Sequence, residues 1–177
     1  MTSPNLTAIW QQEPLAKFSV YTQVQIQHLW KLANEIKQTL DASVQDGIFY
    51  AGKENNLNRV YGDFWLWVLG AYEVVRTMSH YSTCFSESYS AEVVAFKKQI
   101  ATLRMPFAKL QFQGSDKPIN GEASIYSMDT EAKDLSFRIA EKIFSVRPLI
   151  SEFERITKEV KLEDVLFDLR SAPARES

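Results

Sequence analysis

The sequence contains only one cysteine, Cys84, and two histidines, His28 and His80, among its 177 residues. A single cysteine excludes a disulfide within the chain and a zinc site built from several thiolates. Two histidines cannot supply a histidine-rich metal site. We therefore expect a domain that folds by burial of apolar surface alone, and we predict no bound metal ion.

The chain also lacks a long apolar run and an excess of charge of either sign. Its longest apolar run, Phe64 to Leu69, is too short to cross a bilayer. The first residues, Met1 to Asn5, show neither the basic nor the apolar segment of a secretory signal. The 20 basic and 22 acidic residues leave a net charge of -2, which excludes a globally basic nucleic-acid-binding protein. We expect a cytoplasmic protein without a membrane partner.

Sequence signatures of the common catalytic classes are missing as well. The chain has no glycine-rich phosphate loop, no G-x-S-x-G elbow, no H-E-x-x-H, no C-x-x-C pair and no calcium-binding loop. We therefore predict no cofactor, and the sequence leaves open whether the protein is an enzyme.

The size and composition of the chain match one ordinary globular domain. Apolar residues make up 45% and charged residues 24% of the sequence, and a chain of this length buries about 70% of its unfolded surface when it folds. We expect a single helical domain over residues 1–177. Within it, residues 1–14 are expected to form an extended arm and residues 171–177 a loose tail.

Four stretches carry the three-four spacing of apolar residues that is typical of a helix with one buried face. The first covers residues 19–40, and the second covers residues 63–81, with Asp63 as the expected N-cap. Residues 41–62, which are rich in glycine and asparagine, predict a connector with turns. The stretch 63–81 is apolar on most sides, so we expect it to lie at the centre of the fold.

The third and fourth stretches each contain a proline. Pro106 lies inside residues 90–112 and removes one backbone donor, so this segment is either one kinked helix or two shorter helices. The fourth helix is expected to be capped by Ser145 and to end near Lys158, with Pro148 tolerated in its first turn. The apolar residues that follow are expected to dock as a short segment: Val165, Leu166, Phe167 and Leu169.

Residues 123–144 fit two structures. Leu135, Phe137 and Ile139 alternate with polar residues, as in a half-buried strand. A helical spacing also links apolar residues here, so a helix fits as well. We favour a hairpin, because Ser145 can then begin the last helix. The expected fold class is mainly α, a compact bundle of about four main helices with a small β-hairpin near residues 123–144.

One group of polar residues interrupts the apolar central helix. Glu73, Arg76 and His80 follow one another at spacings of three and four, which places them on one stripe. Charges on such a helix must pair, reach solvent or serve a site. The structural interpretation, which we favour, is an ion pair of Glu73 with Arg76 or with a cation on a neighbouring helix. The functional interpretation makes these three residues catalytic.

The stripe supports one concrete chemistry. Arginine can hold a phosphate, and histidine can move protons near neutral pH. An arginine followed closely by a histidine on a helix of a small helical domain resembles the HEPN ribonucleases. The resemblance covers this helix, and the spacing between Arg76 and His80 is shorter here than in that family. The resemblance implies metal-independent cleavage of RNA. A ligand-binding site on the same stripe is the other form that the functional interpretation can take.

A basic stretch provides a further candidate. Between residues 93 and 115 the charged residues are Lys97, Lys98, Arg104 and Lys109, with no acid among them. Helical spacing spreads them over different faces, so a solvated surface is favoured over a phosphate-binding one. Arg104 is kept as a candidate ligand-binding residue, since its approach to Glu73 or Arg76 would create a shared polar pocket.

The absence of catalytic motifs favours a non-enzymatic module that binds another protein or itself. Aromatic residues make up 12% of the chain, and aromatic side chains are enriched at subunit interfaces. The alternative is the HEPN-like ribonuclease or a ligand-binding protein that uses Glu73, Arg76 and His80. Nucleic acid is thus a partner of the alternative and not of the favoured hypothesis.

Overall fold

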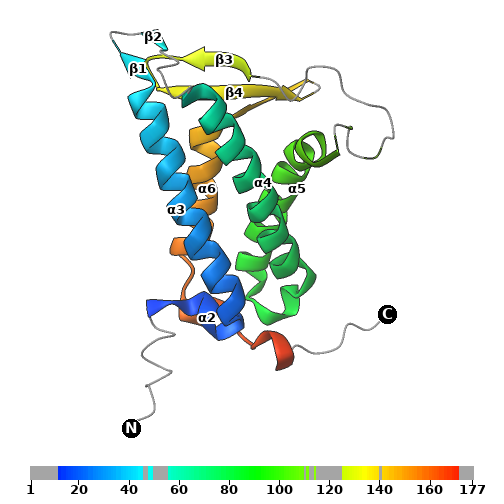
Figure 1. Cartoon of the computed structure of the whole chain (residues 1–177). Helices are drawn as coiled ribbons and strands as arrows, with labels where there is room; N and C mark the ends of the chain where they lie inside the picture. Colours follow the sequence, from blue (N-terminus) through cyan, green and yellow to red (C-terminus); the bar gives the residue numbers. More distant parts are fainter. Residues whose placement is uncertain are drawn as a thin grey trace.

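The computed structural model describes residues 12–45, 48–49, 56–109, 111, 114, 125–139 and 141–171. Four long helices stand together in this part of the chain, and a small antiparallel sheet covers one end of the bundle (Figure 1). The mainly α class with a small β element is therefore confirmed. The helices are α2 (Pro14–Phe18), α3 (Val20–Ala42), α4 (Asn56–His80), α5 (Glu87–Lys109) and α6 (Val146–Lys158). The expected arm up to residue 11 and the tail beyond residue 171 lie outside the described residues.

The first two helices, α2 and α3, are separated at Ser19, which ends one and caps the other. Pro14, the last residue of the expected arm, begins a helix instead: Pro14–Phe18 form α2, with Leu15 and Phe18 fully buried. Proline at the first position of a helix costs nothing, since its missing N–H has no partner there anyway. Ser19 then caps α3, as its hydroxyl accepts a hydrogen bond from the Thr22 amide at 3.2 Å. The predicted apolar face of α3 is buried: Ile26, Leu29, Ala33, Ile36 and Leu40.

The central helix α4 begins seven residues before the expected N-cap. Asp63 lies inside the helix, 3.6 Å from Arg59 one turn earlier, so its assignment as the cap was wrong. The reason is Val60, which is fully buried one turn before Phe64 and extends the apolar face backwards through Gly62. Residues 56–62, expected in the connector, thus belong to the helix. Of that connector, Val44–Gln45 (β1) and Ile48–Phe49 (β2) form a short antiparallel pair.

The central position of α4 is confirmed by what it touches. The helix packs against α3 on one side and α5 on the other. Phe64 stacks on Phe137 of the sheet with ring centroids 5.4 Å apart, and Trp67 meets Phe153 of α6 edge-on at 5.5 Å. Every residue predicted for its main buried face is buried: Phe64, Trp67, Val68, Ala71, Val74, Val75 and Met78. Leu66, in contrast, is 53% exposed.

Helix α5 continues without a break through Pro106, so the alternative of two separate helices is wrong. The proline itself is buried and lies next to Phe107, whose carbonyl accepts a hydrogen bond from the Trp65 indole at 2.8 Å. The predicted apolar seam faces the core at all its described positions: Val93, Phe96, Ile100, Leu103 and Phe107.

The described residues between positions 125 and 145 form three strands rather than a helix. The strands are β3 (Ile125–Asp129), β4 (Asp134–Ile139) and β5 (Lys142–Ser145), and they pair antiparallel in the order β3-β4-β5. The hairpin expectation is confirmed and extended by the third strand. Leu135, Phe137 and Ile139 point into the core with at most 1% exposure, while Ser136 and Arg138 point away.

The last helix is capped in an unexpected way. Ser145 occupies the N-cap position as predicted, but its hydroxyl bonds to the Ser136 hydroxyl at 2.9 Å and not to the helix. The cap is Asp134 of β4 instead, whose Oδ1 accepts from the Arg147 amide at 3.1 Å. Pro148 lies in the first turn and the helix ends at Lys158, both as predicted.

The chain closes with a strap that we define as residues 165–171. Val165 is fully buried and pairs with Phe85, and the amides of Leu166 and Phe167 both donate to the Cys84 carbonyl. The expected docking of this short segment is confirmed for Val165 and Leu169, which pack on the core, whereas the side chains of Leu166 and Phe167 are 48% and 44% exposed. The backbone of the strap is held while these two side chains face outward. None of the helices in the described part of the chain has the length and apolar character needed to cross a membrane.

Candidate functional site

The polar stripe on α4 contains the ion pair that its spacing predicts. The Arg76 guanidinium donates to Glu73 Oε2 at 2.7 and 2.8 Å, and both side chains are about half exposed. His80 is the last residue of α4 and packs edge-on against the Tyr81 ring, with centroids 4.8 Å apart. Among the described residues, no hydrogen bond joins His80 to Glu73 or Arg76. The catalytic role of the three residues stays a prediction.

The exposure of this ion pair limits what it contributes. A solvent-exposed pair at a spacing of three residues stabilises a helix by only a few tenths of a kcal/mol, roughly. A phosphate that approached Arg76 would have to displace the Glu73 carboxylate, which already occupies the guanidinium. The arrangement therefore favours the structural interpretation of Glu73 and Arg76.

Arg104 does not join the stripe. Its guanidinium lies 5.1 Å from the centre of the Tyr72 ring and donates to the Met105 sulfur at 3.0 Å. Lys97, one of the neighbouring cations, donates to the Ser79 hydroxyl of α4 at 3.1 Å. The shared polar pocket that would link Arg104 to Glu73 or Arg76 is not formed by the contacts of these residues. As expected, the cations of α5 are spread over several faces.

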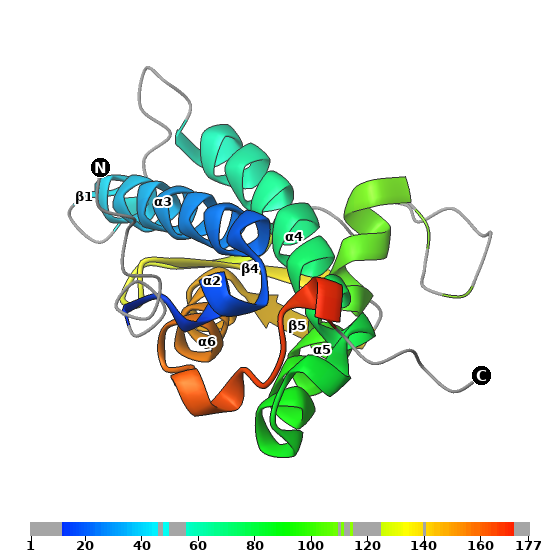
Figure 2. The ribbon, with the colours of Figure 1, turned by 90° about the horizontal axis from the view of Figure 1, so that it is seen from below.

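A different surface, at the opposite end of the bundle from the sheet, combines a hollow with exposed apolar side chains. We call it the base surface and define it by the hollow and by Tyr21, Val20 and Val24 of α3. The hollow measures about 320 Å³ and lies between the α2–α3 corner and the strap. Figure 2 views the bundle from this end. Its lining residues are Ala16, Phe18, Ser19, Val20, Tyr21, Asp168, Leu169 and Arg170.

The exposed residues of the base surface follow from the way Ser19 starts α3. Because the helix begins at Val20, Thr22 and Gln23 in its first turn face inward and are buried. Tyr21 is consequently 86% exposed, Val20 64% and Val24 44%. Single exposed apolar residues are common on protein surfaces, but a cluster beside an apolar hollow marks an interaction site.

Sequence reasoning missed the base surface, although part of its signal is present in the sequence. Val20 and Val24 lie one turn apart on the face of α3 opposite to Ile26 and Ala33, where polar residues are expected. The other half of the surface comes from the strap, about 150 residues later in the chain. Only the fold brings Leu169 beside Phe18.

The charged rim of the hollow carries both signs. Arg170 donates from its Nε to Asp168 Oδ1 and from its terminal nitrogen to Oδ2, both at 3.2 Å. These hydrogen bonds hold the pKa of Asp168 below its usual range. Next to them, burial raises the pKa of the Cys84 thiol, and the charge of Asp168 raises it further. The fully buried Cys84 is therefore a neutral thiol, with no feature of a nucleophile.

In the described part of the chain, no cluster of three or more His, Cys, Asp or Glu is placed to hold a metal ion. Comparison with known proteins adds no assignment to this geometry. The chain matches no protein-family model, and no curated protein or solved structure shows significant similarity to it.

Proposed function

We propose that the protein is a non-enzymatic self-association module, in which the base surface of one copy binds the base surface of a second copy. The observation that carries this proposal is the position of Tyr21. Its ring is 86% exposed and stands at the edge of a hollow of about 320 Å³ that it does not fill.

A projecting side chain and a hollow on the same face favour a symmetric pairing. In a contact with twofold symmetry, each copy offers the same surface, so each Tyr21 meets the hollow of the opposite copy. The hollow has mainly apolar walls, provided by Phe18, Leu169 and the Val20 side chain. Tyrosine is well suited to such a place, since its ring buries a large apolar area and its hydroxyl can stay in water.

The charges around the hollow also favour a second copy over a partner of one charge sign. Asp168 and Arg170 lie on the same rim, and the Arg170 side chain is 89% exposed. When two identical rims meet about a twofold axis, each arginine can face the aspartate of the opposite copy, and the contact then forms twice. A strongly acidic or basic partner would meet one of the two charges unfavourably.

The size of the base surface predicts a weak complex. Stable interfaces bury about 800 Å² on each partner, and the base surface provides only a few large apolar side chains. Leu166 and Phe167, exposed on the strap, extend it. We therefore expect dissociation constants in the micromolar range or above.

Sedimentation velocity at increasing protein concentration tests the proposal. The wild-type protein is expected to sediment faster as its concentration rises through the micromolar range, and Tyr21→Glu is expected to remain a monomer. Leu66→Glu, an equally drastic change at an exposed apolar position of α4, is the matched control and should associate like the wild type. A wild-type protein that stays monomeric, or a Tyr21→Glu variant that still associates, would refute the proposal.

We also propose that the protein is located in the cytoplasm. Cysteines stay reduced in that compartment, and the free, buried thiol of Cys84 fits this proposal.

A further inference from the structure

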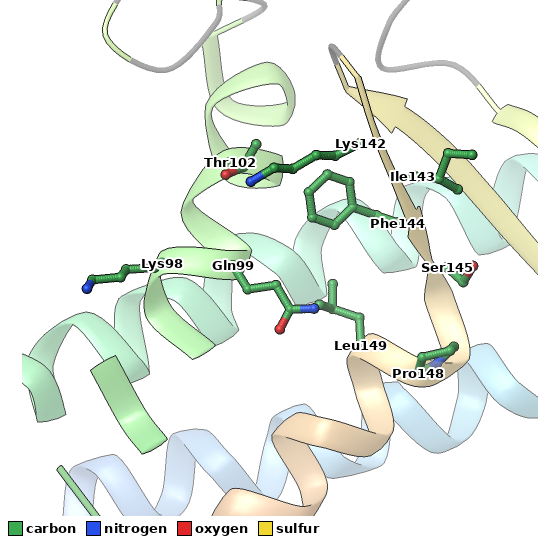
Figure 3. A pocket seen from close by; sticks show the side chains of 9 residues that line it. All are labelled: Lys98, Gln99, Thr102, Lys142, Ile143, Phe144, Ser145, Pro148 and Leu149. Atoms are coloured by element: carbon green, nitrogen blue, oxygen red, sulfur yellow. The ribbon is translucent and has the colours of Figure 1, made fainter. Parts of the chain in front are cut away.

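A second hollow, independent of the base surface, lies near the sheet end of the bundle. It measures about 540 Å³ and is enclosed by three elements: α5, β5 and the first turn of α6. We call it the α5–β5 pocket. Its volume falls in the range of pockets that hold small molecules, about 300–1,000 Å³. Figure 3 shows the side chains that line it.

The pocket combines an apolar floor with polar walls that can donate hydrogen bonds. Phe144 and Leu149 form the floor and are 6% and 2% exposed. Gln99 and Thr102 of α5 and Lys142 of β5 stand around it. In Figure 3, Lys142 reaches across the pocket toward Thr102, and the Gln99 amide points toward Leu149.

The described residues that line this pocket carry charge of one sign. Lys142 and Lys98 are the only charged residues among them, and Lys98 extends outward at the edge of the pocket (Figure 3). Neither lysine makes a hydrogen bond or an ion pair with any described residue. Glu141, next to Lys142 in the chain, pairs with neither of them. Within the described part of the chain, the positive charge of the pocket therefore has no acidic partner.

A third cation lies near the start of α6, and unlike Lys98 and Lys142 it is paired with an acidic residue of the protein. Arg147 is engaged by Asp41 at 2.8 Å, and its backbone amide is bound by Asp134. The carboxylate of Asp134 thus serves as the anion at the N-terminus of α6. In contrast, no acidic side chain lies beside Lys98 and Lys142 among the lining residues that the structure describes.

We infer that the α5–β5 pocket binds a small organic anion, a molecule with one anionic group and an apolar body. The anionic group lies at the Lys142 ammonium, within reach of the Thr102 hydroxyl and the Gln99 amide. The apolar body covers Phe144 and Leu149. Charge-assisted hydrogen bonds to an ammonium are about twice as strong as neutral ones, and Lys98 can turn inward on its flexible stem to add a second.

Titration of the isotope-labelled protein, followed by amide chemical shifts, tests this inference with three probes. Phenyl phosphate and phenylacetate share an apolar ring and differ in the anionic group, while benzyl alcohol has the ring without the charge. We expect saturable shifts at residues 98–102 and 142–145 with one or both anions and much weaker binding of benzyl alcohol. The tighter of the two anions distinguishes an organic phosphate from a carboxylate as the ligand class.

Variants locate the binding. Lys142→Gln is expected to weaken the binding of the anion by about tenfold, the factor that corresponds to one charge-assisted hydrogen bond. Thr102→Val, which keeps the shape of the side chain, is expected to weaken it less. Lys31→Gln, a change at an exposed lysine of α3 outside the pocket, should bind like the wild type. Absence of saturable shifts at the pocket, equal binding of benzyl alcohol, or wild-type affinity in Lys142→Gln would overturn the inference.

Discussion

The side chain of Asp134 provides the sharpest test of how this fold is held together. The residue is 6% exposed and lies at the start of β4, yet its carboxylate serves the N-terminus of α6. Oδ1 accepts hydrogen bonds from the amide of Leu135 at 2.8 Å and from the amide of Arg147 at 3.1 Å. We predict that Asp134→Ala destabilises the protein more than the removal of the nominal cap, Ser145.

The magnitude follows from the two amides that would lose their acceptor. Loss of a side-chain cap costs about 1–2 kcal/mol, and a buried donor without a partner costs about 1–3 kcal/mol. Part of this loss is offset, because Asp134→Ala also removes the cost of burying a charged carboxylate. That cost is reflected in the pKa of Asp134, which burial raises. We expect a net loss of about 2–3 kcal/mol in Asp134→Ala.

Two matched variants separate the cap from general damage. Asp134→Asn keeps an oxygen in the position of Oδ1 and removes the charge, so it should cost less than about 1 kcal/mol. Ser145→Ala should also cost little, since the Ser145 hydroxyl bonds to Ser136 and to no helix amide. Urea denaturation followed by circular dichroism measures all three. In thermal unfolding, Asp134→Ala should lower the Tm by roughly 5–10 °C for a chain of this length.

The pKa of Asp134 adds a dependence on pH with a definite sign. Burial is the main cause that raises this pKa above its ordinary value of 3.8, against the hydrogen bonds from Arg147 and Leu135 that lower it. The native protein thus binds the proton more tightly than the unfolded chain does. The stabilisation that comes with the proton is present at low pH and is lost as the pH rises through the raised pKa.

Comparison with Asp134→Asn isolates this effect, because other carboxylates titrate alike in both proteins. The free energy of unfolding of the wild type, minus that of Asp134→Asn, should decrease as the pH rises from about 4 to neutral. An increase over the same range would refute the reasoning about burial. An Asp134→Ala protein as stable as the wild type would refute the role of the residue as the cap of α6.

Two further predictions concern the central helix. Gly62→Ala should raise the free energy of unfolding by about 0.5–1 kcal/mol, because nothing lies within 4 Å of the added methyl group and alanine favours a helix. Gly70→Ala should gain less, since its methyl carbon would lie 2.9 Å from Leu29 Cδ2, and equal gains in urea denaturation would contradict this close approach. For the ribonuclease hypothesis, we expect no cleavage of RNA by the wild type in the presence of a chelator, because the Glu73 carboxylate occupies the Arg76 guanidinium that would have to bind the phosphate. Cleavage that disappears in folded Arg76→Ala and His80→Ala variants would reverse that conclusion.

The candidate sites show which side-chain contacts can be predicted from residue spacing within a single helix and which cannot. The Glu73–Arg76 ion pair could be predicted, because both residues lie on one turn of one helix and their spacing alone brings them together. The placement of Lys142 beside α5 in one pocket could not be predicted, since the two segments meet only after the sheet folds against the bundle. For the same reason the sequence could not predict the neighbour of Arg104, which is Tyr72 and not Glu73.

The strap illustrates a second limit. Val165, Leu166 and Phe167 are all apolar, and composition alone treats them alike. The amides of Leu166 and Phe167 both donate to the Cys84 carbonyl and the chain bends at Phe167, so the strict alternation of an extended strand is lost here. Val165 becomes core, and the next two residues stay exposed.

The sequence by itself determined the mainly helical class and the buried faces predicted for the long helices, whereas both strand and helix fitted residues 134–139 and the strand was only favoured. These features depend on the period of apolar residues along the chain, which is a local property. Tertiary structure alone decided where α4 begins, which residue caps α6 and which surfaces carry the hollows. Each of these depends on contacts between segments far apart in the chain: Phe64 with Phe137, Asp134 with Arg147, and Phe18 with Leu169. Sequence periodicity holds no information about such contacts, because it describes one element and not its neighbour.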